Sequence, residues 1–128
     1  MPRWRLSTLP TSNPVKRGDI YWLDWTPGRG SEQTGMRPAL VVQTDIANAV
    51  SRYPVTIVLA ISTRVKGYPS NVLIQPTVAN GLAAPSEICT GQLLTVSKER
   101  LSDYIGALSN DDMRRVNETL AYVLGLSS

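Results

Sequence analysis

The chain has 128 residues, of which 42% are hydrophobic and 18% are charged, a balance that suits one folded domain and argues against pervasive disorder. It contains one cysteine and no histidine, which excludes an internal disulfide framework, histidine zinc sites and any catalysis by imidazole. The net charge is +3, and nine of the 13 basic residues lie within residues 1–70 beside four acids, so we expect a basic surface for an anionic partner.

Two features of the sequence bear on its location. No apolar stretch is long enough to span a bilayer, and residues 1–10 lack the continuous apolar segment of a secretory signal. We therefore expect a cytoplasmic protein with no membrane partner. Three prolines among small polar residues in 1–14 predict a flexible N-terminal extension, and the folded domain is expected to occupy residues 15–128.

The first half of the domain is expected to be mainly strand. Residues 17–26 alternate in a strand-like pattern, and a Pro/Gly-rich loop follows to about Met36. Residues 38–43 then form a buried strand, with Pro38 tolerated at its first position. Residues 45–50 are expected to form a short helix or turn, and the β-branched run 55–62 predicts a central strand.

The second half continues with short strands and ends in a helix. A basic loop over 64–69 leads to a strand at 71–75, and two further runs form strands that join into one if Gly91 is a kink. Ser109 is a capping residue for a C-terminal helix whose apolar positions run from Met113 to Leu124. The predicted fold is mainly β: a small curled sheet or barrel with a helix packed on it.

Arg37 is the first candidate for chemistry. Its guanidinium is always charged and can grip two phosphate oxygens at once, and it lies between a glycine-containing loop and the rigid Pro38. The alternative is a structural ion pair with Asp19, Asp24 or Glu32, and the spacing alone leaves both interpretations open.

Ser62 and Thr63 end the central strand, where their hydroxyls could orient a phosphate or a ribose hydroxyl, although such hydroxyls more often satisfy turn backbone groups. The loop that follows carries Arg64, Lys66 and Tyr68, and cations beside an aromatic ring suit single-stranded nucleic acid. A solvated hairpin loop would have the same composition.

The loop over residues 28–33 is a second flexible polar segment, and it includes Glu32, which could accept a proton, orient Arg37 or simply be solvated. It matches neither a Walker loop nor a dinucleotide fingerprint. Cys89 is expected to pack in the core, because the chain has no histidine to activate it.

Three blocks carry a resemblance to a known family: residues 15–22 (VKRGDIYW), residues 30–42 (GSEQTGMRPALVV) and residues 66–69 (KGYP). Together they resemble the MazF/PemK toxins of bacterial toxin–antitoxin modules, over roughly residues 15–125. The resemblance implies an SH3-like β-barrel with appended short helices and a C-terminal helix, working as a homodimer.

The same resemblance implies an activity and partners. Members of the family cut single-stranded RNA at short sequences without a metal or other cofactor, leaving a 2′,3′-cyclic phosphate and a free 5′ hydroxyl. A cognate MazE-like antitoxin silences them by laying an extended acidic segment over the RNA groove, and contact with DNA would come through the antitoxin complex.

Carried over by motif, Arg37 matches the family's catalytic arginine, and Ser62 falls where a catalytic threonine is usual, with Thr63 next to it. Glu32 matches a glutamate implicated in some members. Gln92 resembles the glutamine of a later motif, in which Gly91 here replaces the usual acid. The expected RNA-binding residues are Arg29, Ser31, Gln33, Arg64, Lys66, Tyr68 and Gln92.

The expected reaction is attack of a ribose 2′ hydroxyl on the adjacent phosphate, accelerated by alignment and charge stabilisation. Two alternatives remain. CcdB-like proteins share this architecture but poison DNA gyrase, and the residue 30–42 block argues against that reading. The other is a noncatalytic module that binds single-stranded nucleic acid.

Overall fold

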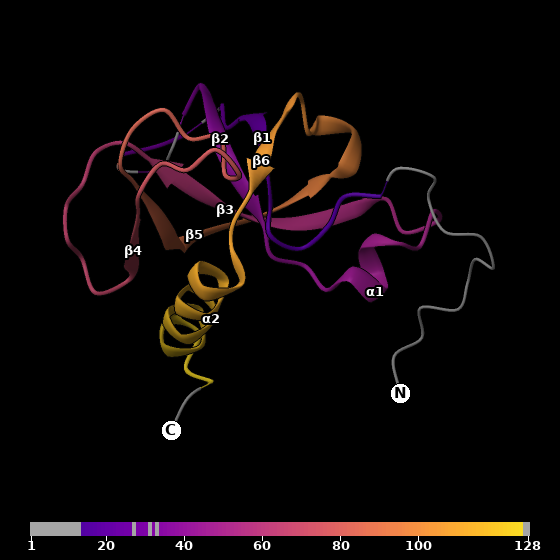
Figure 1. Cartoon of the computed structure of the whole chain (residues 1–128). Coiled ribbons are helices and arrows are strands. Elements are labelled where there is room, and N and C mark those ends of the chain that lie inside the picture. Colours follow the sequence, from indigo (N-terminus) through magenta and orange to yellow (C-terminus); the bar gives the residue numbers. More distant parts are fainter. Residues whose placement is uncertain (1–13, 27, 31, 33, 127–128) are drawn as a thin grey trace.

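The computed structural model describes residues 14–26, 28–30, 32 and 34–126 (Figure 1). The expected flexible extension falls almost entirely outside these residues, so the domain boundary near residue 15 stays a prediction. The elements of the described chain follow in the order β1 (Asp19–Asp24), β2 (Met36–Val41), α1 (Asp45–Asn48), β3 (Val55–Ser62), β4 (Asn71–Ile74), β5 (Ser86–Ser97), the 3-10 turn η1 (Lys98–Arg100), β6 (Tyr104–Ala107) and α2 (Asn110–Val123).

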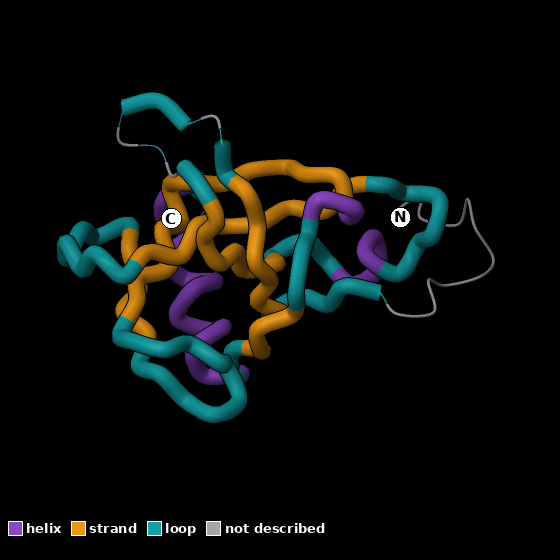
Figure 2. The backbone as a smooth tube through the Cα atoms, turned by 90° about the horizontal axis from the view of Figure 1, so that it is seen from above, coloured by secondary structure: helices purple, strands orange, loops and turns teal. Residues whose placement is uncertain are grey.

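The strands form one antiparallel sheet in the order β4-β5-β3-β2-β1-β6. The sheet curls, and α2 packs against β4 and β5 on one of its sides (Figure 2). The prediction of a mainly β fold with a curled sheet and a C-terminal helix is confirmed. None of the described helices is long and apolar enough to cross a membrane.

Both faces of the central strands are buried, as their continuous apolar runs require. Alternate residues of β2 and β3 point to opposite sides. Leu40 and Leu59 join the larger core, which includes Met113 and Val116 of α2. Ala39, Val58 and their neighbours form a second, smaller core on the other face, around Leu23, Trp25, Val41, Ala60, Cys89 and Val96.

The two edges of the curled sheet meet at a pair of glycines. The N–H of Ala107 in β6 donates to the carbonyl of Ala79 at 2.9 Å, which ties the segment after β4 to β6. A Cβ at Gly81 would lie 2.2 Å from the carbonyl oxygen of Ile105, and one at Gly106 would lie 2.5 Å from that of Ala79. No side chain fits at either position, so the closure needs glycine on both sides.

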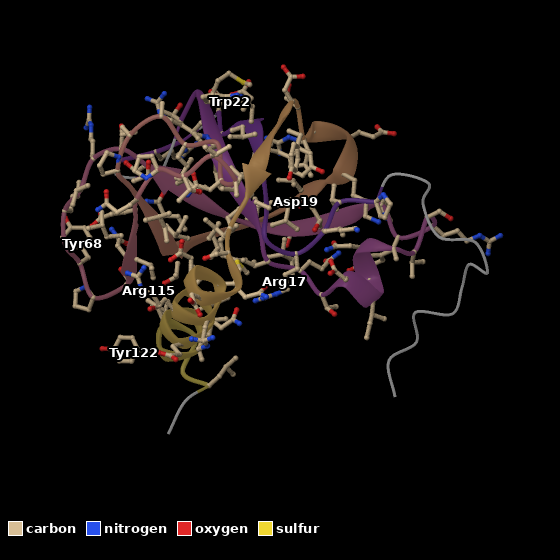
Figure 3. All side chains as sticks on the ribbon, in the orientation of Figure 1. Arg17, Asp19, Trp22, Tyr68, Arg115 and Tyr122 are labelled. Carbon is tan, nitrogen blue, oxygen red and sulfur yellow. The ribbon has the colours of Figure 1, made fainter. Side chains whose placement is uncertain are left out.

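Helix α2 begins as predicted and is fastened by Arg17. The Ser109 hydroxyl accepts the N–H of Asp112 at 3.1 Å, which caps the helix. Arg17 donates from Nε to the carbonyl of Val42 and from Nη2 to Oδ1 of Asn117 on α2. Figure 3 shows Arg17 reaching across the gap between the sheet and the helix. The prediction that the apolar face extends to Leu124 is wrong at its end, because this residue is 51% exposed.

Two details of the strands bear on the site. Strand β2 begins at Met36, two residues earlier than predicted, and Pro38 lies inside it. This is tolerated because β2 pairs with β3 only from Ala39 onward, so no ladder bond is missing at the proline. The kink expected at Gly91 is confirmed, since β5 is one strand whose register with β3 jumps from Leu93 to Cys89.

Candidate functional site

One groove of about 940 Å³ collects most of the residues singled out from the sequence. Its walls come from β1, β2, the end of β3, the loop after β3 and the bulge of β5. The predicted site residues that line it are Glu32, Arg37, Ser62, Thr63, Arg64, Lys66, Tyr68 and Gln92. Glu32 and Gln92, which are 60 residues apart in the sequence, therefore meet in one hollow.

Arg37 is held on β2 with its side chain exposed in the groove. It pairs with Leu23 of β1, and its Nη1 donates to the carbonyl of Met36 at 3.1 Å. The ion pairs in the described part of the chain both lie on α2. The alternative of a structural ion pair to an acid is therefore not seen, and the guanidinium has donors left for an anion.

Ser62 and Thr63 stand at the end of β3. Ser62 is paired with Glu87 of β5, is half-buried, and its hydroxyl oxygen accepts the N–H of Arg64 at 3.1 Å. This is the turn-satisfying role that the sequence left open, and it leaves the Ser62 O–H free to donate outward. Thr63 is exposed and lines the groove.

The loop after β3 forms one wall of the groove. Arg64, Lys66 and Tyr68 are all exposed, and the ammonium of Lys66 lies 5.8 Å from the ring centroid of Tyr68. Figure 3 places Tyr68 on the outer side of this loop, away from α2. Two cations and an aromatic ring therefore project together from a short segment, which is an arrangement suited to phosphates and bases.

Glu32 lines the groove but does not contact Arg37. Its carboxylate accepts the backbone N–H of Arg29 at 2.6 Å, and its own N–H donates to the carbonyl of Arg29 at 3.0 Å. The suggestion that Glu32 orients Arg37 finds no ion pair in this structure. Arg29 is exposed and is not among the residues that line the groove. The expected RNA-binding residues Ser31 and Gln33 lie outside the described residues.

A smaller hollow of about 270 Å³ adjoins the groove and shares Glu32, Gly91 and Gln92 with it. Trp25 lies in its wall, and its buried indole Nε1 has no hydrogen-bond partner among the described residues. Gln92 therefore stands between two hollows, at the bulge of β5.

Glu87 is the residue that sequence reasoning missed. It is 2% exposed, yet both of its carboxylate oxygens are hydrogen-bonded. Burial raises the pKa of Glu87, but hydrogen bonds from Lys66, Gly67 and Asn71 lower it by more, so the net pKa lies below its usual value. The available signal was a charged residue in a strand whose other residues are all uncharged, because a charge that becomes buried requires hydrogen-bond partners.

Cys89 is buried, as expected, and burial raises the pKa of its thiol to about 11. A thiol of this kind stays protonated at neutral pH and is a poor nucleophile. The described residues contain no group of three or more Cys, Asp or Glu side chains that could hold a metal ion.

Comparison with known proteins places this groove in context. Residues 16–124 match the family model described as PemK-like, MazF-like toxin of type II toxin-antitoxin system. The chain is 41% identical over 114 residues to Endoribonuclease EndoA of Bacillus subtilis (strain 168), covering 88% of this chain and 96% of that protein.

Solved structures agree in fold. MazF (Form-I) from Deinococcus radiodurans superposes with a TM-score of 0.73 at 26% identity, covering 89% of this chain and 99% of that one. A MazE-MazF structure (Form-II) from the same organism gives 0.70 at 26% identity, with 91% and 100% covered. The match over 109 residues of sequence, with the curled sheet and its terminal helix, means that the chain belongs to the PemK-like, MazF-like toxins of type II toxin–antitoxin systems.

Proposed function

We propose that this protein is the toxin of a toxin–antitoxin module and acts as a sequence-specific, metal-independent endoribonuclease on single-stranded RNA. The observation that carries the proposal is the groove itself, which Arg37 lines together with the hydroxyls at the end of β3 and the basic side chains of the loop beyond them. The likeness to an endoribonuclease at 41% identity supports the same conclusion.

The groove suits a single strand. Arg64 and Lys66 attract the phosphates, while Tyr68 offers a ring on which a base can stack. Arg37, with no acid paired to it in the described chain, takes the scissile phosphate by two N–H donors. We expect Gln92, which lines the groove at the bulge, to contact a neighbouring nucleotide.

The proposed chemistry needs no histidine. The ribose 2′ oxygen bonds to phosphorus while the bond from phosphorus to the 5′ oxygen breaks, giving a 2′,3′-cyclic phosphate and a 5′ hydroxyl. Arg37 stabilises the charge that develops on the phosphorane, and Ser62, with Thr63 beside it, donates an O–H to a non-bridging oxygen. Glu32, the carboxylate among the described lining residues, accepts the 2′ proton, and water supplies the proton that the 5′ oxygen gains.

The proposal extends to partners. A MazE-like antitoxin would cover the groove with an acidic segment, and the MazE-MazF likeness supports a partner of that class. The protein would work as a cytoplasmic homodimer. DNA would be reached only through the antitoxin complex.

The test incubates the purified protein with a long RNA in EDTA, maps the cut sites and identifies the end groups. We expect cleavage at a short recurring sequence with 2′,3′-cyclic phosphate ends. Arg37→Ala should lower kcat/KM by at least about 100-fold, the size of effect seen when a donor to a developing anion is removed. Arg114→Ala, which alters an exposed ion pair on α2, is the matched control and should cut normally.

Three results would contradict the proposal in different ways. Undiminished cleavage by Arg37→Ala would remove that residue from the site. Cleavage that stops in EDTA and returns with a divalent ion would contradict metal independence. RNA binding that weakens with salt but never leads to cleavage would identify a noncatalytic binding module.

A further inference from the structure

The loop over residues 63–70, which we call the basic loop, is not held by the sheet ladder alone. Its two cations and Tyr68 point outward, and its backbone turns through Gly67 at a φ of +71°. Loops with exposed polar side chains are ordinarily among the least ordered parts of a domain. What fixes this one lies beneath it, on β5.

Glu87 is placed on the middle strand at this end of the sheet. It pairs with Ser62 of β3 on one side and with Leu73 of β4 on the other. Its side chain is 2% exposed and does not line the groove. A carboxylate this deeply buried is unfavourable unless hydrogen bonds replace its water.

Those hydrogen bonds come from the basic loop. The N–H of Lys66 donates to Oε1 and the N–H of Gly67 to Oε2, each at 2.9 Å. Asn71, at the start of β4, donates from Nδ2 to Oε1, also at 2.9 Å. Two successive backbone amides and one side chain thus converge on one carboxylate, which uses both of its oxygens.

A second contact fastens the end of the same loop. Thr90, three residues along β5, donates from Oγ1 and from its backbone N–H to the carbonyl of Ser70, at 2.7 and 3.1 Å. At the beginning of the loop, Ser62 accepts the N–H of Arg64. The loop is therefore tied at three points, and Glu87 holds the central one.

We propose that Glu87 is a positioning residue, whose buried carboxylate holds the backbone of the basic loop so that Arg64, Lys66 and Tyr68 are presented to the groove. The hydrogen bonds described above support the claim that Glu87 holds the loop. The expected effect on RNA binding rests in addition on the proposed function. Because the negative charge faces the backbone amides, the cationic side chains above stay available for phosphate.

The test compares Glu87→Gln with the parent protein. Glutamine keeps the shape but has one acceptor oxygen in place of two, so at least one loop amide loses its partner. We expect the Lys66 and Gly67 amides to exchange with solvent at least about tenfold faster. We also expect KM for RNA to rise about tenfold with kcat within about threefold of the parent, because binding contacts are loosened while Arg37 is untouched.

Thr56→Val is the matched control. Thr56 is fully buried on the same strand pair, at the opposite end, where its hydroxyl donates to Oδ1 of Asn48 at 2.8 Å. This variant removes a buried hydrogen bond without touching the basic loop. It should lower stability while leaving both KM and the exchange of the loop amides unchanged, which separates positioning from a general loss of stability.

The two measurements, amide exchange and RNA cleavage kinetics, also separate this inference from the proposed function. If the parent protein leaves RNA intact, the proposed function is overturned and amide exchange still decides whether Glu87 holds the loop. If the parent cuts RNA and Glu87→Gln has unchanged amide exchange and KM, Glu87 is not a positioning residue. If Glu87→Gln fails to fold, amide exchange in the parent protein becomes the deciding measurement. Its Lys66 and Gly67 amides must exchange more slowly than that of Val65, which has no acceptor among the described residues.

Discussion

Single residues in the groove differ in how firmly their positions are fixed. Ser62 is the last residue of β3, and its hydroxyl oxygen accepts the N–H of Arg64, whereas Thr63 lies beyond the strand and is exposed. A hydroxyl that is held in place loses less freedom when it donates to a phosphate, so it contributes more to binding the transition state. The structure therefore favours Ser62 for the hydroxyl role, although the family usually has threonine there.

Removing each hydroxyl in turn checks this assignment. Ser62→Ala should lower kcat/KM at least about tenfold, which corresponds to one lost hydrogen bond in the transition state, and Thr63→Ala by clearly less. Ser62→Thr, which restores the hydroxyl, should keep most of the activity. A larger loss in Thr63→Ala than in Ser62→Ala would transfer the role to Thr63.

At the scale of elements, the closure of the curled sheet depends on two glycines rather than on a ladder of strand pairs. Gly81 lies against the carbonyl of Ile105, and Gly106 lies against the carbonyls of Ala79 and Asn80. These are backbone atoms, which cannot move aside as the end of a flexible side chain can. Gly81 also has a φ of +68°, a conformation that L-residues with a Cβ rarely adopt.

Alanine substitutions test this closure. Gly81→Ala and Gly106→Ala should each lower the free energy of unfolding by about 2 kcal/mol or more, since the new Cβ meets a carbonyl. Gly91→Ala is the control, because a Cβ there meets nothing within 4 Å, and it should stay within about 0.5 kcal/mol of the parent. Urea unfolding measures all three, and equal losses would show that the close approach does not matter.

Much of the element order follows from the sequence. Alternation and β-branched runs predicted the strands, because successive side chains of a strand point to opposite faces of the sheet. Ser109 predicted the start of α2. Arg37, the hydroxyls at the end of β3 and the loop after them were predicted from their chemistry and position, and Gln92 came from the family resemblance. Glu87 was not, because its partners depend on the register of β5 with two other strands. The hydrogen bond from the Arg29 backbone N–H to the Glu32 carboxylate was missed for a similar reason, because hydrogen bonds within a loop leave no periodic pattern in the sequence.

For the whole molecule, the lowered pKa of Glu87 links folding to pH. A carboxyl whose pKa is lower in the folded than in the unfolded chain adds stability above its ordinary value of 4.5, and that stability is lost as the pH falls through the folded pKa. Protonation removes the charge that the loop amides and Asn71 bind, so acid should weaken this end of the sheet first.

Unfolding curves at several pH values check the link. Glu87→Gln should be less stable than the parent by about 1–3 kcal/mol at pH 7, the cost of weakening hydrogen bonds to a buried charge. The difference should shrink as the pH falls below about 4.5, where the parent carboxyl also becomes neutral. Glu118→Gln, the same change at an exposed position of α2, is the control and should be as stable as the parent at pH 7. A difference that stays constant with pH would rule out Glu87 as the source.

The order of the strands also affects how the protein is made. Strand β1, near the start of the chain, pairs with β6, the last strand, and Ile105 of β6 lines the groove that Trp22 of β1 also lines. A ribosome must therefore release almost the entire chain before the groove can exist, since domains fold only when their partners have emerged. A chain that ends before β6 lacks both the partner of β1 and the Ile105 part of the groove wall. If the protein cuts RNA as proposed, we expect such a fragment not to do so.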